Sequence, residues 1–442
     1  MTYPEKSHVA IDANTAMAAN SKPLTLLIVG AGLCGLSAAI STLLAGHKVI
    51  IFESSSELKE VGAGLQLTPN GTRLLSSWGI ADRLSQHATT PTEFTYHRYD
   101  GRILAHRSNY DSEILNRYGS PIWCLHRADL QKAMVERAVE LGANLQLGSR
   151  VTNVDLELAT LTLGNGNTIR GDIVLAADGL WSSTRNIFMG QDVMPRATGD
   201  LAYRLVLDTN DIYDVELQEW LQTFGIHIWA GPGVHAVAYS IKGGRLLNLV
   251  LLVPDDLPTT VSRAEGNIHE MLKLFEGWDP ILTKFLRYAT KVDKWRLNHL
   301  PTLETWKTES GSFIMAGDSC HAMLPYMAQG ANSSLEDGAT IGTLLSHVSS
   351  KRQIPSAMAL YDAIRRPRLD RLVRETFIQG YEHHLPDGKL QVKRDLQLAK
   401  SFRKLDLNAP VEETWSHPKI QPWIFSYNVY ETVERAFAEH SF

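Results

Sequence analysis

Apolar and polar residues follow two periods along the chain, and these periods predict where strands and helices lie. Residues 24–29 form a short apolar run that ends in glycines, residues 33–45 show helical periodicity, and residues 48–53 form a second apolar run. This order predicts a βαβ unit. Further helices are expected at 127–141, 334–349, 357–382 and 389–404.

The middle of the chain has a different character. From 198 to 300 it consists of strand-like runs, such as 201–207 and 246–252, separated by turns rich in glycine and proline. This pattern predicts an antiparallel sheet inserted into a mostly parallel α/β lobe, to which buried strands at 173–177 and 313–316 belong. The expected divisions are a flexible tail at 1–23, the first part of the parallel lobe at 24–197, the inserted sheet at 198–300, a return segment at 301–350 and a helical region at 351–442.

The composition is that of a folded globular protein: of 442 residues, 44% are hydrophobic and 21% charged. The net charge of -5, without a basic stretch, argues against nucleic acid and anionic membranes as partners. Three scattered cysteines without C-x-x-C spacing predict neither a disulfide framework nor a metal site. Residues 1–22 lack the apolar core of a signal peptide, and glycines interrupt the apolar segment 24–52, so a cytoplasmic protein without a membrane span is expected.

A glycine-rich turn follows the first predicted strand and opens the first helix. It reads GAGLCG and contains Gly30, Gly32 and Gly35. In such a turn the glycines let a pyrophosphate approach the backbone, while the helix N-terminus offers free N–H groups. Glu53 ends the next strand, where a carboxylate can bind the 2'-hydroxyl of an adenosine ribose and repel a 2'-phosphate. The turn therefore suits FAD or NAD better than NADPH.

Two later motifs resemble those of one protein family. The string DIVLAADGLWSSTR at 172–185 resembles the Asp-Gly motif of class A flavoprotein monooxygenases. The string GDSCHAMLP at 317–325, followed by QGAN, resembles that family's FAD-binding Gly-Asp segment. The resemblance extends from about residue 24 to residue 430 and is greatest to the salicylate-hydroxylase-like branch, especially to fungal polyketide phenol hydroxylases with sorbicillin-type or orcinaldehyde-type substrates. It implies a Rossmann-like FAD lobe, an inserted substrate sheet, and a role in secondary metabolism.

The resemblance also implies cofactor contacts beyond the glycine turn. Asp318 would accept hydrogen bonds from ribitol hydroxyls, and the N–H groups of the helix that follows would face the flavin pyrimidine edge. The arginine of the HRADL segment would contact the FAD, and the aspartate of the Asp-Gly motif would serve both FAD and the NADPH pyrophosphate. The implied residues are Arg127, Asp178, Asp318, Gly330, Ala331 and Asn332.

Candidates for the substrate side come from the same resemblance. In fungal members that hydroxylate phenols, an arginine on the inserted sheet holds the phenolate and a nearby tyrosine assists deprotonation. Arg204 and Tyr239 stand at the matching places, and Tyr118 is a further candidate for contacting the phenol. The chemistry is consistent, since a guanidinium that stabilises a phenolate makes the ring richer in electrons for an electrophilic oxygen donor. Structural roles, a cross-strand salt bridge for Arg204 and packing for Tyr239, remain alternatives.

Three other groups have plainer interpretations. The adjacent pair His383 and His384 is expected on a solvated helix face, because neighbouring helical residues point in different directions. The RRPR string at 365–368 is expected to be a surface and capping cluster, with an NADPH-phosphate role as the alternative. His321 is expected to shape the flavin loop rather than to bind a metal.

We therefore expect an FAD-dependent monooxygenase that uses NADPH as a transient co-substrate and dioxygen to hydroxylate a phenol through a flavin hydroperoxide. Attack at an alkylated ring carbon would give oxidative dearomatisation. A decarboxylating salicylate-type hydroxylase or an epoxidase on the same fold is an alternative. A reductase or redox interaction module that binds FAD is an alternative of a different class. Monomer and dimer are both compatible with the sequence.

Overall fold

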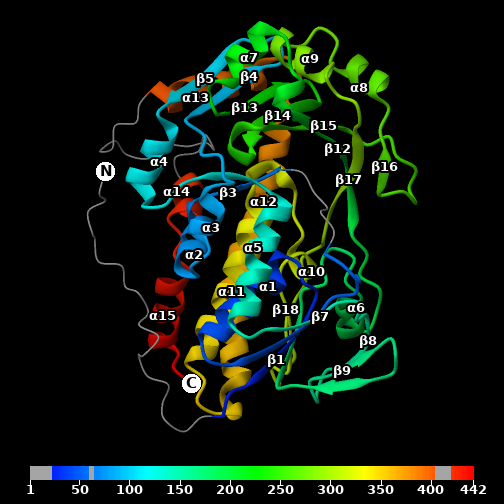
Figure 1. The fold of residues 1–442 in the computed structure, drawn as a ribbon, viewed down its shortest axis with the longest axis vertical. Helices are drawn as coiled ribbons and strands as arrows, with labels where there is room; N and C mark the ends of the chain where they lie inside the picture. Colours follow the sequence, from blue (N-terminus) through cyan, green and yellow to red (C-terminus); the bar gives the residue numbers. More distant parts are fainter. Residues whose placement is uncertain (1–21, 59–63, 404–419) are drawn as a thin grey trace.

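A computed structural model describes residues 22–58, 64–403 and 420–442. Nearly all of the predicted tail at 1–23 lies outside these residues. The described chain forms two lobes, a lower lobe around a parallel sheet and an upper lobe around a larger sheet (Figure 1). The predicted α/β class with an inserted antiparallel sheet and C-terminal helices is confirmed.

The lower lobe contains a five-stranded sheet in which every neighbouring pair is parallel. Its order is β18 (Phe313–Met315), β11 (Ile173–Ala176), β1 (Thr25–Val29), β2 (Lys48–Phe52) and β7 (Asn144–Gln146). The chain thus leaves this sheet and returns to it, as the short buried runs predicted.

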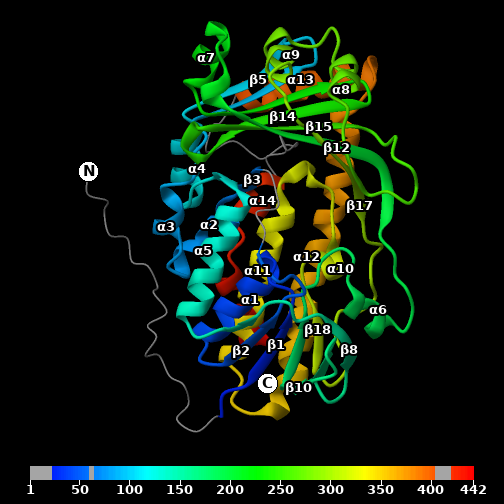
Figure 2. The same cartoon turned by 45° about the vertical axis from the view of Figure 1, so that its right-hand side comes forward.

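Helices α1 (Leu33–Leu44) and α11 (Gln329–Ser346) pack tightly in the lower lobe. Gly338 and Gly342, one turn apart on α11, lie against Ser37 and Ser41 of α1, and a Cβ at either glycine would come within 2.2 Å of a serine Oγ. The Ser37 hydroxyl donates to the Ser334 carbonyl at 2.9 Å. The glycines therefore set the distance between the two helices, whose amino-terminal ends both face the upper lobe (Figure 2).

The upper lobe is built on an eight-stranded sheet. Its order is β16 (Arg263–Glu265), β17 (Asp293–His299), β12 (Arg196–Asp208), β15 (Leu246–Pro254), β14 (Val234–Ile241), β13 (Gly225–Gly231), β4 (Glu93–Arg98) and β5 (Ile103–Ser108). Strands β4 and β5 were not predicted from the sequence; they come from far earlier in the chain and join β13 through a parallel pairing. The predicted boundary at residue 198 therefore leaves two strands of the large sheet in the segment that precedes it.

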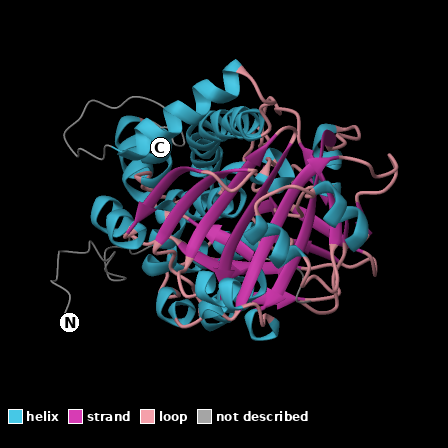
Figure 3. Ribbon diagram, turned by 90° about the horizontal axis from the view of Figure 1, so that it is seen from above, coloured by secondary structure: helices cyan, strands magenta, loops and turns pink. Residues whose placement is uncertain are grey.

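The two faces of this sheet have different partners. Helices α7 (Val215–Leu221), α8 (Ile268–Leu274) and α9 (Pro280–Leu286) cover the outer face (Figure 2), and Figure 3 looks down on this sheet from above. A separate apolar core on this face includes Trp229 and Phe285. The inner face looks toward the lower lobe. Because side chains alternate along a strand, every second residue of β12 to β15 points to that lobe.

The remaining elements surround these two layers. Among them are α12 (Ile354–His383), which runs between the lobes, and β3 (Gly64–Leu67), which pairs with β6 (Trp123–His126). The others are α2 (Pro69–Ser77), α3 (Ala81–Ser85), α4 (Tyr110–Tyr118), α5 (Arg127–Glu140), β8 (Val151–Asp155), β9 (Thr160–Leu163), β10 (Thr168–Arg170), α6 (Ser183–Met189), α10 (Asp318–His321), α13 (Lys389–Arg403), α14 (Ile420–Phe425) and α15 (Val429–Glu439). In the part of the chain that the structure describes, no helix is long and apolar enough to cross a membrane.

Candidate active site

A cavity of about 410 Å³ lies between the two lobes. The lower lobe contributes the glycine turn, the residues after β11 and the start of α11, whereas the inner face of the large sheet forms the roof. Residues of both lobes line it, among them Gly32, Arg127, Asp318, Gly330 and Ala331 below and Arg204, Ile226, Val237 and Tyr239 above. One cavity thus joins most of the residues assigned separately to cofactor and substrate.

The glycine turn has the geometry that its sequence predicts. Gly30 has φ +104°, and a Cβ there would lie 2.5 Å from the Ala177 carbonyl oxygen. A Cβ on Gly35 would lie 2.1 Å from the Gly30 carbonyl oxygen, whereas one on Gly32 would meet no atom within 4 Å. Gly30 and Gly35 are therefore required by close packing, and Gly32 leaves open space beside the uncapped first turn of α1. A pyrophosphate fits that space, because free N–H groups face it.

Glu53 is tied to the glycine turn. Its carboxylate accepts hydrogen bonds from the Ala31 N–H at 3.0 Å and the Ser55 N–H at 2.8 Å. The side chain is half-buried, so a carboxylate oxygen can still accept from a ligand hydroxyl. The Gln131 side chain of α5 also donates to the Ala31 carbonyl at 2.9 Å. The turn is thus held from both sides in a fixed shape.

Asp318 and Arg127 both face the cavity. Neither side chain forms a hydrogen bond or an ion pair with another described residue. Desolvation raises the pKa of Asp318, while His321 and Arg127 act in the opposite direction. Asp318 is exposed to the open cavity and Arg127 is half-buried, so both side chains can still form hydrogen bonds with a ligand. The pair therefore fits a polar cofactor that supplies hydroxyl groups to the carboxylate and an acceptor to the guanidinium.

The start of α11 offers free backbone donors to the same space. Ala328 has φ +54° and caps the helix without a side-chain hydrogen bond, and Gly330 and Ala331 line the cavity. The Asn332 side chain has a different role, because it accepts from the Thr68 N–H at 3.0 Å and donates to the Ala328 carbonyl at 2.6 Å. The helix start is thereby anchored to α2, with its N–H groups directed at the cavity.

The Asp178 carboxylate is used inside the protein. It accepts hydrogen bonds from the Ser182 hydroxyl at 2.5 Å and from the Thr184 hydroxyl and N–H at 2.8 and 3.1 Å. It therefore caps the first turn of α6, and its neighbours Ala177 and Gly179 line the cavity instead. Its predicted contact with FAD or NADPH stays a prediction.

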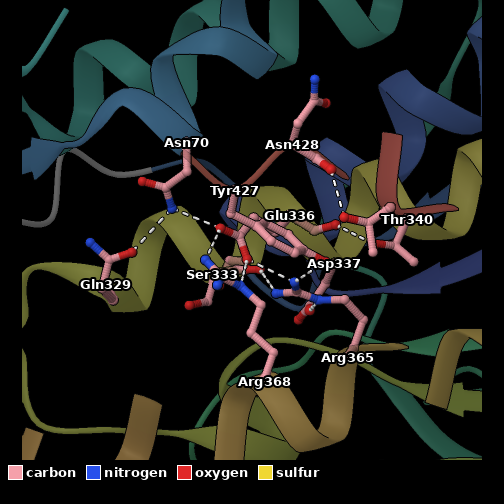
Figure 4. A network of polar contacts seen from close by, with 12 residues as sticks. Asn70, Gln329, Ser333, Glu336, Asp337, Thr340, Arg365, Arg368, Tyr427 and Asn428 are labelled. Carbon is pink, nitrogen blue, oxygen red and sulfur yellow. Dashed lines mark hydrogen bonds and ion pairs between the residues drawn. The ribbon is translucent and has the colours of Figure 1, made fainter. Parts of the chain in front are cut away.

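Behind the start of α11 lies a buried ionic network (Figure 4). Arg365 donates to Glu336 and Asp337, both at 2.7 Å, and Arg368 donates to Glu336 at 2.8 Å. The expectation that the RRPR string forms a surface cluster is wrong for these two arginines, which are buried because α11 supplies adjacent carboxylates. Asn70 of α2 also donates to Glu336 at 2.7 Å.

Asp337 links this network to the segment 317–321, which follows β18 and contains Asp318. It accepts from the Gly317 N–H at 2.8 Å and from His321 Nε2 at 2.5 Å. Burial alone would raise the pKa of Asp337, but His321 and Arg365 lower it to about 2. The placement of His321 agrees with the expectation that it shapes the flavin loop.

Arg204 and Tyr239 share the roof of the cavity. Arg204 lies opposite Val250, which in turn lies opposite Val237, two residues from Tyr239. Burial lowers the pKa of Arg204 and raises that of Tyr239, and each charge partly opposes the other's shift. The Arg204 side chain has no hydrogen bond or ion pair with a described residue. A half-buried guanidinium without an acidic partner at an apolar roof suits an anionic ligand.

The third substrate-side candidate lies elsewhere. Tyr118 ends α4, packs edge-on against Phe425 with ring centroids 5.3 Å apart, and reaches Gln421 at 3.4 Å. It does not belong to the residues that line the cavity. The geometry therefore brings Arg204 and Tyr239 together but not Tyr118.

The opposite end of the roof holds polar residues that were not predicted from the sequence. His235, Tyr326 and His383 line the cavity there, and His235 Nδ1 lies 2.7 Å from His384 Nε2. The expectation of a solvated face for His383 and His384 is wrong, because the large sheet covers this end of α12 and leaves His383 2% exposed. His235 stands four residues before Tyr239 on β14. Because alternate residues of a strand point to the same face, this spacing could have placed His235 on the roof from the sequence alone.

The fold and cavity define a class of protein, a two-lobed enzyme that binds a dinucleotide cofactor beneath a substrate sheet. A family model described as "FAD binding domain" matches residues 24–376. The FAD-dependent monooxygenase OpS4 of Beauveria bassiana is 45% identical over 421 residues, which cover 94% of this chain and 98% of the relative. The 3-hydroxybenzoate 6-hydroxylase of Polaromonas naphthalenivorans is 29% identical, covering 86% of this chain and 93% of its own.

A solved salicylate hydroxylase with its substrate has a TM-score of 0.76 at 23% identity, covering 94% of this chain and 98% of its own, and supports the fold. The chain therefore belongs to the FAD-binding-domain family and is an FAD-dependent monooxygenase of class A.

Proposed function

We propose that this monooxygenase uses NADPH and dioxygen to hydroxylate an electron-rich phenol, with Arg204 and Tyr239 as the residues that hold it. The observation that carries the proposal is the Arg204 guanidinium, which faces the cavity without an acidic partner among the described residues. A bound phenolate would supply the missing negative charge and a charge-assisted hydrogen bond. Relatives named as hydroxylases of hydroxybenzoates support a substrate of this class.

Each residue has a separable role in this proposal. FAD, when bound, supplies the activated oxygen. Arg204 binds the phenolate oxygen and keeps the ring rich in electrons, which favours attack by an electrophile. Burial keeps the Tyr239 phenol protonated, because it raises its pKa; its hydroxyl can thus exchange a proton with the substrate oxygen. The apolar roof residues Ile226, Val237 and Val250 exclude water from the ring.

Oxygen would enter the ring carbon ortho to the phenolate oxygen. Where that carbon carries hydrogen, proton loss restores the aromatic ring and gives a dihydroxy product. Where it carries an alkyl group, no proton can leave and a hydroxydienone results. We propose the second outcome for an alkylated polyketide phenol, the substrate class that the sequence resemblance implies.

The test is incubation with alkylated resorcinols and hydroxybenzoates, NADPH and ¹⁸O₂, followed by mass spectrometry. One labelled oxygen in a hydroxylated or dearomatised product, with substrate-dependent NADPH oxidation, is the expected result. Release of carbon dioxide from a 2-hydroxybenzoate would identify the decarboxylating alternative. Oxidation of NADPH without label in any product would support the FAD-binding reductase and refute the proposal.

A further inference from the structure

A second hollow of about 220 Å³ adjoins the active-site cavity. Its lining includes Arg204, Arg263, Lys291 and Trp295. Arg204 belongs to the lining of both spaces and therefore lies between them. The hollow is therefore a neighbour of the catalytic cavity on the substrate side.

The strand register shows in which direction the hollow extends. Ala202, two residues from Arg204 on β12, lies opposite Trp295 of β17, and Trp295 lies opposite Arg263 of β16. Paired residues project from the same face of a sheet, and so do residues two apart on a strand. Trp295 and Arg263 thus continue the inner face from Arg204 toward the free edge at β16.

Exposure rises along this line. Arg204 and Trp295 are half-buried, whereas the Arg263 side chain is 50% exposed and Lys291 is exposed. The guanidinium of Arg263 lies 4.4 Å from the centroid of the Trp295 ring, and that of Arg204 lies 5.2 Å from it. Trp295 therefore connects an outer cation at the rim with the inner cation of the cavity.

The charge of this hollow is opposite in sign to that of the whole protein. Three cationic side chains, Arg204, Arg263 and Lys291, line it with one acid, Asp293, which pairs with Arg263 at 3.2 Å. The chain as a whole carries a net charge of -5. A positive concave patch on a negative protein concentrates anions locally and steers them in solution.

We propose that this hollow is an outer binding site that captures a phenolic substrate by a carboxylate or similar anionic group before its ring reaches Arg204. The inference rests on the proposed function, since it assigns the anion to the substrate. Size favours this ligand over NADPH: ligand pockets for drug-sized molecules enclose about 300–1,000 Å³, and 220 Å³ holds one substituted ring rather than a dinucleotide. Lys291 and Arg263 attract the anion, and Arg204 receives it.

The test compares two probes of one shape and different charge, 3-hydroxybenzoate and 3-hydroxybenzyl alcohol. Rapid mixing with the FAD-loaded enzyme, without NADPH, measures the rate of capture through the flavin absorbance. In Arg263→Gln and Lys291→Gln, capture of the anion should slow by about three- to tenfold and lose most of its dependence on ionic strength. Capture of the alcohol should stay at the wild-type rate. Arg245→Gln removes an arginine that is 69% exposed and outside the hollow, and it should leave both probes unaffected.

Equal slowing of both probes, an unchanged salt dependence, or no capture of the anion by the wild-type enzyme would overturn the proposal. A higher KM for NADPH in Arg263→Gln, with the rate of aromatic capture unchanged, would also overturn it, because that result would assign the hollow to the dinucleotide. The measurement needs no turnover, so its outcome is separate from the labelling test. An enzyme that captures the anion through Arg263 but never incorporates label would refute the proposed function and leave the outer anion site intact.

Discussion

Gly64 of β3 and Tyr239 of β14 touch across the boundary between the two lobes. A Cβ built on Gly64 would lie 2.7 Å from Cε2 of Tyr239 and 2.8 Å from Cγ of Asn248. The Gly64 N–H donates to Asn248 Oδ1 at 2.7 Å, which holds the contact in place. A residue of the cofactor lobe thus fixes the position of a residue of the substrate roof.

Replacing Gly64 by alanine should therefore disturb catalysis more than cofactor binding. The added methyl group must displace the Tyr239 ring or the hydrogen bond to Asn248, and overpacking of this kind costs about 1–3 kcal/mol. Steady-state turnover should fall by roughly tenfold, while the FAD content of the purified protein stays near the wild-type level. Gly164→Ala is the control, because its Cβ would meet nothing closer than 3.8 Å. Wild-type turnover in Gly64→Ala would contradict the proposed role of Tyr239.

Gly32 and Asp318 provide a test of the cofactor site. A Cβ on Gly32 would meet no protein atom within 4 Å, so Gly32→Leu should fold normally yet occupy the space beside the free N–H groups of α1. Asp318→Ala removes from the cavity a carboxylate that has no partner among the described residues. Both variants should lose FAD on gel filtration while keeping the wild-type far-UV circular dichroism. Full FAD occupancy in both would refute the cofactor assignment.

Local patterns were sufficient to predict the parallel lobe. The run at 24–29, the glycine turn and the run at 48–53 form β1, α1 and β2 nearly as expected, because each depends on neighbouring residues alone. By contrast, β4 joins a strand more than a hundred residues away, and no local period shows that pairing. Arg365 was placed on the surface because the sequence does not reveal that α11 brings Glu336 and Asp337 against it. Contacts between segments far apart in the sequence decide whether such a side chain is buried.

The buried network predicts a large loss of stability for one arginine and a smaller loss for its neighbour. Arg365→Met would remove the buried guanidinium that pairs with both Glu336 and Asp337, and breaking a buried pair in this way costs about 3–5 kcal/mol. Arg366→Met is the matched comparison, since Arg366 is 34% exposed and, among the described residues, pairs only with the mostly buried Asp362 one turn away; water solvates the arginine end of this pair, so its loss should cost less than that of Arg365. Urea unfolding measures both. Equal destabilisation by the two changes would contradict the network's role.

Asp337 should make stability depend on acidity. Its folded pKa of about 2 lies below the usual value of 3.8, so its contribution is fully present above pH 3.8 and is lost as the pH falls toward 2. The free energy of unfolding, measured by urea titration across that range, should fall more steeply in wild type than in Asp337→Asn. Parallel curves for the two proteins would show that another carboxylate dominates acid unfolding.

Arg204 and Tyr239 are expected to act on the substrate and not on the cofactor, because both line the roof, whereas the residues assigned to FAD lie on the other lobe. Arg204→Ala removes a charge-assisted contact worth about 1.5–3 kcal/mol, so turnover should fall by roughly ten- to a hundredfold with FAD still bound. Tyr239→Phe keeps the ring and its packing but loses the hydroxyl, so the rate should drop most at pH values below the substrate's own phenol pKa.

At higher pH the substrate ionises unaided, and the defect of Tyr239→Phe should shrink. The tyrosine itself does not titrate in that range, because burial raises its pKa. The pH profile of kcat/KM therefore separates a proton-transfer role from a packing role, for which the defect would be the same at every pH. A pH-independent defect in Tyr239→Phe, or wild-type turnover in Arg204→Ala, would exclude the pair as the residues that hold the phenolate.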